Sequence, residues 1–144
     1  MQKLLFLLAL LSLPMGAFAQ MGILGTWLDA EKRGQVEIYR SENGKYYGKI
    51  VWLKTPNDPK TGKPQLDDKN PDPALRNRPV MGLVVLRSFH EQSPTVLTDG
   101  YIYNPKDNKT YACILTLKDP ATLYVRGYIG ISLIGKTETW TRVK

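Results

Sequence analysis

A run of acidic and amide side chains in the middle of the chain is the set of residues best spaced for metal chemistry. The run consists of Asp67, Asp68, Asn70 and Asp72. With Asp68 as the first ligand, the next two members fall on the following ligand positions of a calcium loop. Such a loop then requires glycine and a final glutamate, but the chain has Pro73 and Pro79 at these places. We therefore predict no metal site, and expect the acids to cap turns and to pair with Arg76 or Arg78.

A second candidate is a basic and aromatic pair near the C-terminus. Arg126 and Tyr128 resemble the Arg-x-Tyr element with which intracellular fatty-acid-binding proteins hold a carboxylate. A guanidinium and a phenol in an apolar cavity would give charge-assisted hydrogen bonds to one anionic head group. In the strand pattern, however, Arg126 falls opposite Leu123 and Val125, which favours an exposed arginine with an aromatic neighbour at a turn. Both interpretations stay open.

Side chains that could act as nucleophiles or bases are few. The chain has one histidine, His90, and one cysteine, Cys113. We expect His90 to be exposed in a polar turn and Cys113 to be a small buried apolar residue. The sequence has no Gly-x-Ser-x-Gly element, and we expect Glu138 to pair with Arg126 or Arg142. We predict no catalytic residue and no cofactor, and a hydrolase is the least favoured alternative.

Residues 1–19 have the features of a cleaved export signal. Lys3 gives a positive start, and residues 4–13 form an apolar run that is long enough for a signal core and too short to cross a bilayer. Ala-Phe-Ala at 17–19 is a small-x-small cleavage site. We predict cleavage after Ala19, which leaves one secreted or periplasmic domain over residues 20–144 with no membrane span.

The remaining sequence alternates with period two and predicts strands almost throughout. The expected strands cover residues 25–28, 35–40, 46–53, 80–89, 100–103, 110–117, 123–127 and 136–143. About eight or nine strands joined mostly by short turns predict an all-β fold, either a sandwich or a closed antiparallel up-and-down barrel. The chain of hairpins favours the barrel, and a barrel of eight strands can enclose one small ligand.

Alternation along these strands predicts which side chains line the cavity. The inward-facing set is Ile38, Ile50, Trp52, Val84, Leu86, Tyr111, Cys113 and Leu115. This assignment depends on strict alternation, because a shift by one residue turns every side chain of a strand to the other face.

One long loop interrupts the strand pattern. Residues 54–79 hold six of the ten prolines and are rich in Lys, Asp and Asn. Proline removes backbone donors, so we expect no central strand here. We predict an ordered lid over one mouth of the barrel, with Asp68, Asn70, Arg76 and Arg78 as its polar residues.

Two sequence signatures connect this pattern to known families. Gly25-Thr26-Trp27 resembles the Gly-x-Trp signature of lipocalins and other calycins, in which the tryptophan closes one barrel end under a basic residue of the last strand. Arg142 is the matching residue, and a guanidinium stacked on an indole gains cation–π energy.

A longer set of motifs resembles the bacterial domain-of-unknown-function family 2147, whose members are exported proteins with a lipocalin-like barrel. The matching stretches are GTW (25–27), YGKIVW (47–52), DKNPDPALRNRP (68–79), GYIYNP (100–105), RGYIG (126–130) and LIGKTETWTRV (133–143). The resemblance implies the fold and export, and it brings no catalytic residues.

The sequence therefore favours an exported barrel that binds a small apolar or amphipathic ligand, which could be anionic and lipid-like. The alternative is a protein-interaction module at the envelope or host surface, with a barrel core filled by side chains. The net charge of +7 favours anionic partners. We predict no nucleic-acid partner, because the basic residues are scattered and the domain is expected to be exported.

Overall fold

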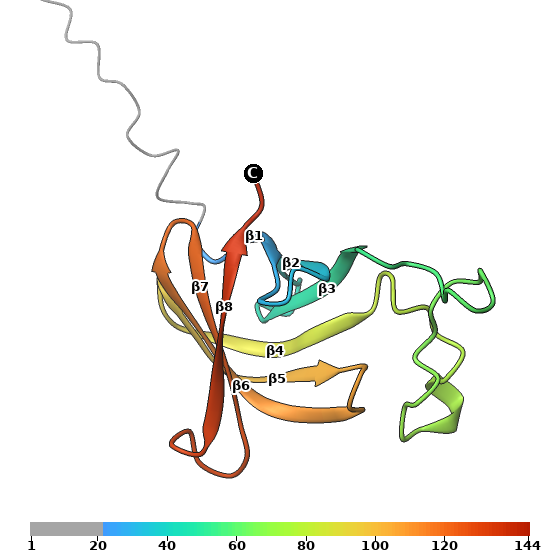
Figure 1. Ribbon diagram of the computed structural model, residues 1–144. Helices are drawn as coiled ribbons and strands as arrows, with labels where there is room; N and C mark the ends of the chain where they lie inside the picture. The colour runs from blue at the N-terminus through green and yellow to red at the C-terminus, as the bar shows by residue number, and fades with distance from the viewer. Residues whose placement is uncertain (1–21) are drawn as a thin grey trace, which may run out of the picture.

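The computed structural model describes residues 22–144, which form a barrel with one long loop at its side (Figure 1). The predicted signal peptide, 1–19, and its cleavage site lie outside the described residues. Within residues 22–144 the structure contains no helix that is long and apolar enough to cross a membrane.

Eight strands and one short 3-10 helix make up the fold. They are β1 (Gly25–Leu28), β2 (Gly34–Arg40), β3 (Tyr46–Leu53), η1 (Pro73–Leu75), β4 (Val84–Ser93), β5 (Val96–Asn104), β6 (Lys109–Asp119), β7 (Thr122–Tyr128) and β8 (Gly135–Arg142). Each strand pairs antiparallel with its chain neighbour, and β8 returns to pair with β1, so the sheet closes in the order β1 to β8. The up-and-down barrel is confirmed, and the sandwich is excluded.

One end of the barrel is closed by Trp27 and Arg142, as the sequence predicts. Trp27 is fully buried, and its indole Nε1 donates a hydrogen bond to the Ile23 carbonyl at 2.9 Å. The Arg142 guanidinium lies 4.2 Å from the centre of the Trp27 ring. It also donates to the carbonyl oxygens of Pro120, Leu24 and Gly22. The guanidinium thus ties the β6–β7 turn and the segment before β1 over the indole.

Strand β5 is longer than predicted because it contains a bulge that resembles a turn in the sequence. Asp99-Gly100 is typical of a hairpin turn, but here the register shifts between Leu97 and Gly100 and the strand continues. A Cβ atom on Gly100 would lie 2.3 Å from the Phe89 ring. Glycine is required at this position because Phe89 fills the space inside the barrel.

Candidate functional site

A cavity of about 1160 Å³ extends from the barrel interior to the end opposite Trp27. Its mouth lies among the β1–β2, β3–β4, β5–β6 and β7–β8 connections, which all meet at the same end of an up-and-down barrel. Apolar side chains form most of its wall. Those from the strands include Val36, Ile50, Leu53, Val85, Ile102, Tyr111, Val125 and Trp140.

The rim of the cavity carries charges of both signs. The charged rim residues are Asp29, Glu31, Arg33, Asp68, Lys69, Lys106, Asp107, Lys136 and Glu138. Lys106 Nζ lies 2.7 Å from Glu31 Oε2 and so connects the β5–β6 and β1–β2 turns across the mouth. The hydrogen bond and the charge of Lys106 lower the pKa of Glu31. The mouth of the cavity is therefore polar, whereas its wall is mostly apolar.

The long loop is fixed to the barrel by a buried carboxylate, which we call the Asp67 latch. Asp67 accepts hydrogen bonds from Tyr103 Oη of β5 at 2.6 Å, from Asn70 Nδ2 at 2.8 Å and from Arg78 Nη2 at 2.9 Å. Both Asp67 and Asn70 are buried. The loop also lines the cavity through Gln65 and its neighbours. The structure thus places an ordered loop beside the mouth, held by Asp67 rather than by Asp68, which is exposed.

The remaining polar loop residues have the structural roles expected of them. Asp72 Oδ1 accepts a hydrogen bond from the Ala74 amide and caps η1. Arg76 Nε donates to the Asn70 carbonyl at 2.8 Å. The prediction of turn caps and acid–arginine pairs is therefore confirmed, with Asp67 as the acid and Arg78 as its partner.

Burial and hydrogen bonding shift the pKa values in the latch. Desolvation and the hydrogen bond to Asp67 raise the pKa of Tyr103 to about 12. Burial acts to raise the pKa of Asp67, but the hydrogen bonds from Tyr103, Asn70 and Arg78 outweigh it and lower that pKa. Near neutral pH the latch therefore consists of an ionised acid and a protonated phenol, neither of which is poised to exchange a proton.

Removing the latch carboxylate should release the loop. Asp67→Ala leaves the Tyr103 hydroxyl and Arg78 without their acceptor, and should lower the free energy of unfolding by about 1–3 kcal/mol. Limited proteolysis should then cut the variant within residues 54–79 much faster than the unaltered protein. Asp68→Ala is the matched control and should leave the cutting rate unchanged. Equal cutting of all three proteins would contradict the latch.

The latch should also give the protein a defined acid response. Because the pKa of Asp67 is lowered by folding, its ionised form stabilises the fold above the unfolded-state pKa of about 3.9. This contribution should be lost only as the pH falls through the lower, folded-state pKa. The difference in melting temperature between the unaltered protein and Asp67→Asn should be constant from pH 7 to pH 5 and shrink at lower pH. A difference that shrinks already near pH 6 would rule out Asp67 as the titrating group.

Three of the predicted ligand-binding residues line the cavity, namely Ile50, Tyr111 and Tyr128. Four others, Ile38, Leu86, Cys113 and Leu115, are buried in the hydrophobic core. Their inward orientation is therefore confirmed, but none of the four lines the cavity.

Two predicted cavity residues, Trp52 and Val84, are wrong for the same physical reason. Trp52 is 40% exposed. In β3, Ile50 pairs with Val36 and Trp52 pairs with Gln35, so Val51 has no partner of its own and forms a bulge. After the bulge the side chains alternate in the opposite sense, and Trp52 points outward. In β4, Val84 pairs with Lys49 and is only partly buried, whereas Val85 is buried and lines the cavity.

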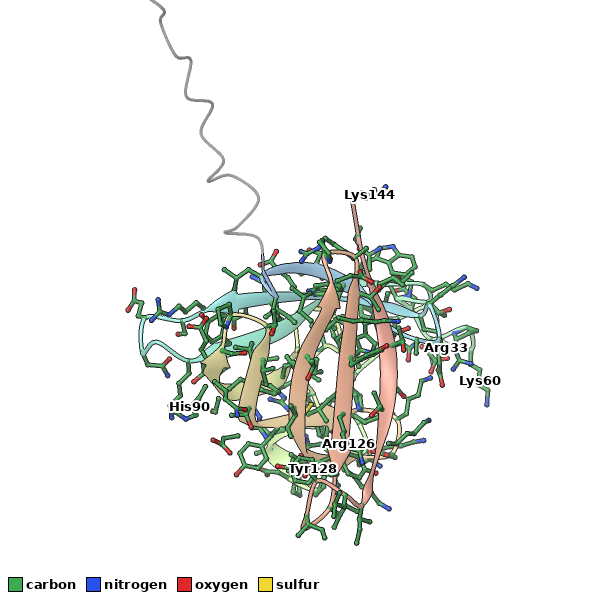
Figure 2. All side chains as sticks on the ribbon, turned by 90° about the vertical axis from the view of Figure 1, so that its left-hand side faces the viewer. Arg33, Lys60, His90, Arg126, Tyr128 and Lys144 are labelled. Carbon is green, nitrogen blue, oxygen red and sulfur yellow. The ribbon has the colours of Figure 1, made fainter. Side chains whose placement is uncertain are left out.

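The Arg126–Tyr128 pair does not converge on one head group inside the barrel. Arg126 lies on the outside, where its Nε donates to the Ser132 carbonyl at 2.8 Å and its Nη1 to Thr137 Oγ1 at 2.9 Å. Tyr128 lines the mouth. Figure 2 shows both residues near the lower end of the strands that face the viewer. The exposed-arginine interpretation of the sequence is the one that the structure supports.

Glu138 and Trp140 also line the cavity. The sequence predicted an ion pair for Glu138, and it did not place Trp140 among the cavity residues. Glu138 does not pair with Arg126 or Arg142: its Oε1 lies 3.7 Å from Lys136 Nζ, and its Oε2 accepts a hydrogen bond from Trp140 Nε1 at 3.4 Å. Trp140 and Arg142 are two residues apart on one strand and therefore share a face. Since Arg142 was expected to stack on the inward Trp27, the same spacing indicates an inward indole for Trp140.

Cys113 should be inert in the folded protein. It is fully buried, and desolvation raises the pKa of its thiol to about 12. Iodoacetamide at pH 8 should therefore leave the native protein unmodified by mass spectrometry and modify it fully in denaturant. Rapid labelling of the native protein would mean that the core opens at Cys113.

His90 is exposed, as predicted.

Comparison with known proteins supports this architecture. The family model described as "Uncharacterized protein conserved in bacteria (DUF2147)" matches residues 25–142. No curated protein sequence matches the chain. A solved structure with a similar fold is titled "Protein HP1028 from the human pathogen Helicobacter pylori belongs to the lipocalin family". It is 27% identical, with a TM-score of 0.71 over 84% of this chain and 82% of that one. The barrel is thus lipocalin-like, and the chain belongs to the bacterial family of domain of unknown function 2147.

Proposed function

We propose that this protein binds one small amphipathic molecule, with the apolar part in the barrel cavity and the polar end at the charged rim. The observation that carries the proposal is the cavity of about 1160 Å³, which opens at one end of a barrel whose other end is closed by Trp27 and Arg142. Apolar walls favour burial of hydrocarbon at about 25 cal/mol per Å². The solved lipocalin with a similar fold supports ligand binding as the general role.

The polar groups of the cavity indicate which end of the ligand meets which part of the site. Trp140 and Glu138 offer an apolar ring beside a carboxylate on the wall. Lys106 and Lys136 at the rim can pair with an anionic head group, although each also contacts an acid of the protein. The proposal therefore places a head group at the rim lysines and not at Arg126.

We also propose that the protein acts outside the cytoplasm and is not an enzyme. Export rests on the signal-like residues 1–19. The hydrolase alternative needs a group that exchanges protons near neutral pH. Burial and the hydrogen bond to Asp67 raise the pKa of Tyr103, and the hydrogen bonds to Asp67 outweigh its burial and lower its pKa. The interaction-module alternative needs a barrel filled by side chains, and the size of the cavity does not support it.

Ligand binding can be tested by fluorescence and thermal stability. Long-chain fatty acids and lysophospholipids are the probes, and Trp140 is the reporter because it lines the cavity, whereas Trp52 lies outside. Binding should quench the tryptophan emission, and the quenching should persist in Trp52→Phe and disappear in Trp140→Phe. The melting temperature should rise with ligand concentration. If no probe changes either signal, and none co-purifies with the protein in native mass spectrometry, ligand binding is refuted.

A further inference from the structure

The turn between β7 and β8 carries a concentration of exposed aliphatic side chains, which we call the apolar tip. Residues 129–134 read Ile-Gly-Ile-Ser-Leu-Ile. Its four large side chains, Ile129, Ile131, Leu133 and Ile134, are between 57% and 85% exposed. Turns normally use glycine, asparagine, aspartate and serine. Core packing does not explain these aliphatic residues, because their side chains lie mostly in solvent.

The apolar tip is an ordered structure held by its own backbone. The Ile129 amide donates to the Ile134 carbonyl at 3.2 Å, and the Ile134 amide donates to the Ile131 carbonyl at 3.0 Å. Arg126 braces the turn from outside through its hydrogen bond to the Ser132 carbonyl. The lower end of Figure 2 shows this turn beyond Arg126 and Tyr128. The tip therefore presents its aliphatic side chains in a defined, protruding arrangement.

Two cations, Arg126 on β7 and Lys136 on β8, flank the apolar tip on its own strands. Lys136 is the second residue of β8, and its side chain is 84% exposed and lies 3.7 Å from Glu138 Oε1. Arg126 supplies the second positive group through its contact with the Ser132 carbonyl, and the whole chain carries a net charge of +7. An apolar projection beside exposed cations is complementary to a bilayer with anionic head groups.

From this arrangement we infer that the apolar tip inserts into the surface of an anionic lipid bilayer and docks the barrel with its mouth toward the membrane. A protein partner fits less well, because a stable interface takes about 20–30 residues from each side, and the tip is a single turn. Ile129 and Ile134 also line the cavity mouth, so the docked barrel would open directly onto the lipid. Docking adds a partner to the proposed function and does not depend on it.

The test uses a fluorophore placed on the tip. Because Cys113 is buried, Leu133→Cys supplies an accessible thiol for an environment-sensitive probe, and Val51→Cys on the outer face of β3 is the matched control. The protein is taken after export, and its N-terminus is determined first. Vesicles of phosphatidylglycerol and phosphatidylethanolamine should shift the emission at position 133 to the blue. Lipids with spin-labelled acyl chains should quench it. The label at position 51 should not respond.

Two further variants separate the apolar and ionic contributions. Ile131→Ser with Leu133→Ser should weaken sedimentation with these vesicles by at least about tenfold. Lys136→Gln should weaken it by about fivefold, and phosphatidylcholine vesicles should bind less than anionic ones. Filling the cavity through Gly127→Phe should leave docking unchanged, which separates this proposal from ligand binding.

Three outcomes would overturn the docking proposal. The first is an unchanged emission at position 133 when anionic vesicles are added. The second is an equal response at position 51, which would mean that the barrel inserts as a whole. The third is a blue shift at position 133 that depends on protein concentration without lipid, which would assign the tip to contact with a second copy of the chain.

Discussion

Replacing Trp27 by alanine should lower the free energy of unfolding by about 3–5 kcal/mol. The Trp27 side chain is fully buried, and its loss would leave a cavity at the closed end of the barrel. It would also remove the ring under the Arg142 guanidinium and leave the Ile23 carbonyl without its indole donor. Chemical denaturation followed by circular dichroism measures the effect.

Trp52→Ala is the matched control for this prediction. The side chain has the same chemistry, but it lies on the outer surface and is 40% exposed. Its removal should change the free energy of unfolding by no more than about 1 kcal/mol. Similar losses in the two variants would show that Trp27 does not close the barrel. A large loss in Trp52→Ala alone would show that the bulge in β3 is wrongly placed.

Gly127→Phe should abolish most ligand binding without unfolding the barrel. Gly127 lines the cavity, and a Cβ atom there would make ordinary van der Waals contacts at 3.6 Å with Tyr111 and at 3.7 Å with Ile102. A phenylalanine ring would extend into space that the ligand must occupy. The affinity for the best fatty acid or lysophospholipid should fall by at least about tenfold, measured by calorimetry.

Gly127→Ala serves as the control for the cavity variant. It makes the same change at the backbone but adds only a methyl group, so it should keep most of the affinity. The melting temperatures of both variants should stay close to that of the unaltered protein, since aromatic residues suit strands better than glycine. Full affinity in Gly127→Phe would place the ligand outside the cavity.

The sequence predicts the barrel because its eight strands and the Gly-x-Trp signature are local features. It predicts the cavity wall less well, because inward and outward side chains alternate regularly only as far as the first bulge in a strand. The bulge at Val51 turns Trp52 outward. The register shift in β4 places Val85, and not Val84, on the inner face. These irregularities depend on the partner strand, so no pattern within one strand reveals them.

The Asp67 latch shows a second limit of sequence reasoning. Asp67 and Tyr103 are 36 residues apart, and their hydrogen bond forms only because the loop folds back onto β5. The prolines and polar residues of 54–79 predicted an ordered loop, but nothing in the sequence distinguished the buried Asp67 from the exposed Asp68. Burial of a single carboxylate is a tertiary property, and it required the structure.

The seam between β8 and β1 has a consequence for how the molecule assembles. It pairs only Trp27 with Arg142 and Leu28 with Thr141, whereas β7 and β8 pair along the whole of β7. Arg142 bonds to carbonyls that precede it by 118 and 120 residues, so this seam has the largest loop-closure entropy in the fold. Ring closure should therefore be the last step of folding. A hydrophobic ligand that is present during this step would be enclosed as β8 pairs with β1. In the folded protein, amide hydrogen exchange should be fastest among the strand pairs at this seam.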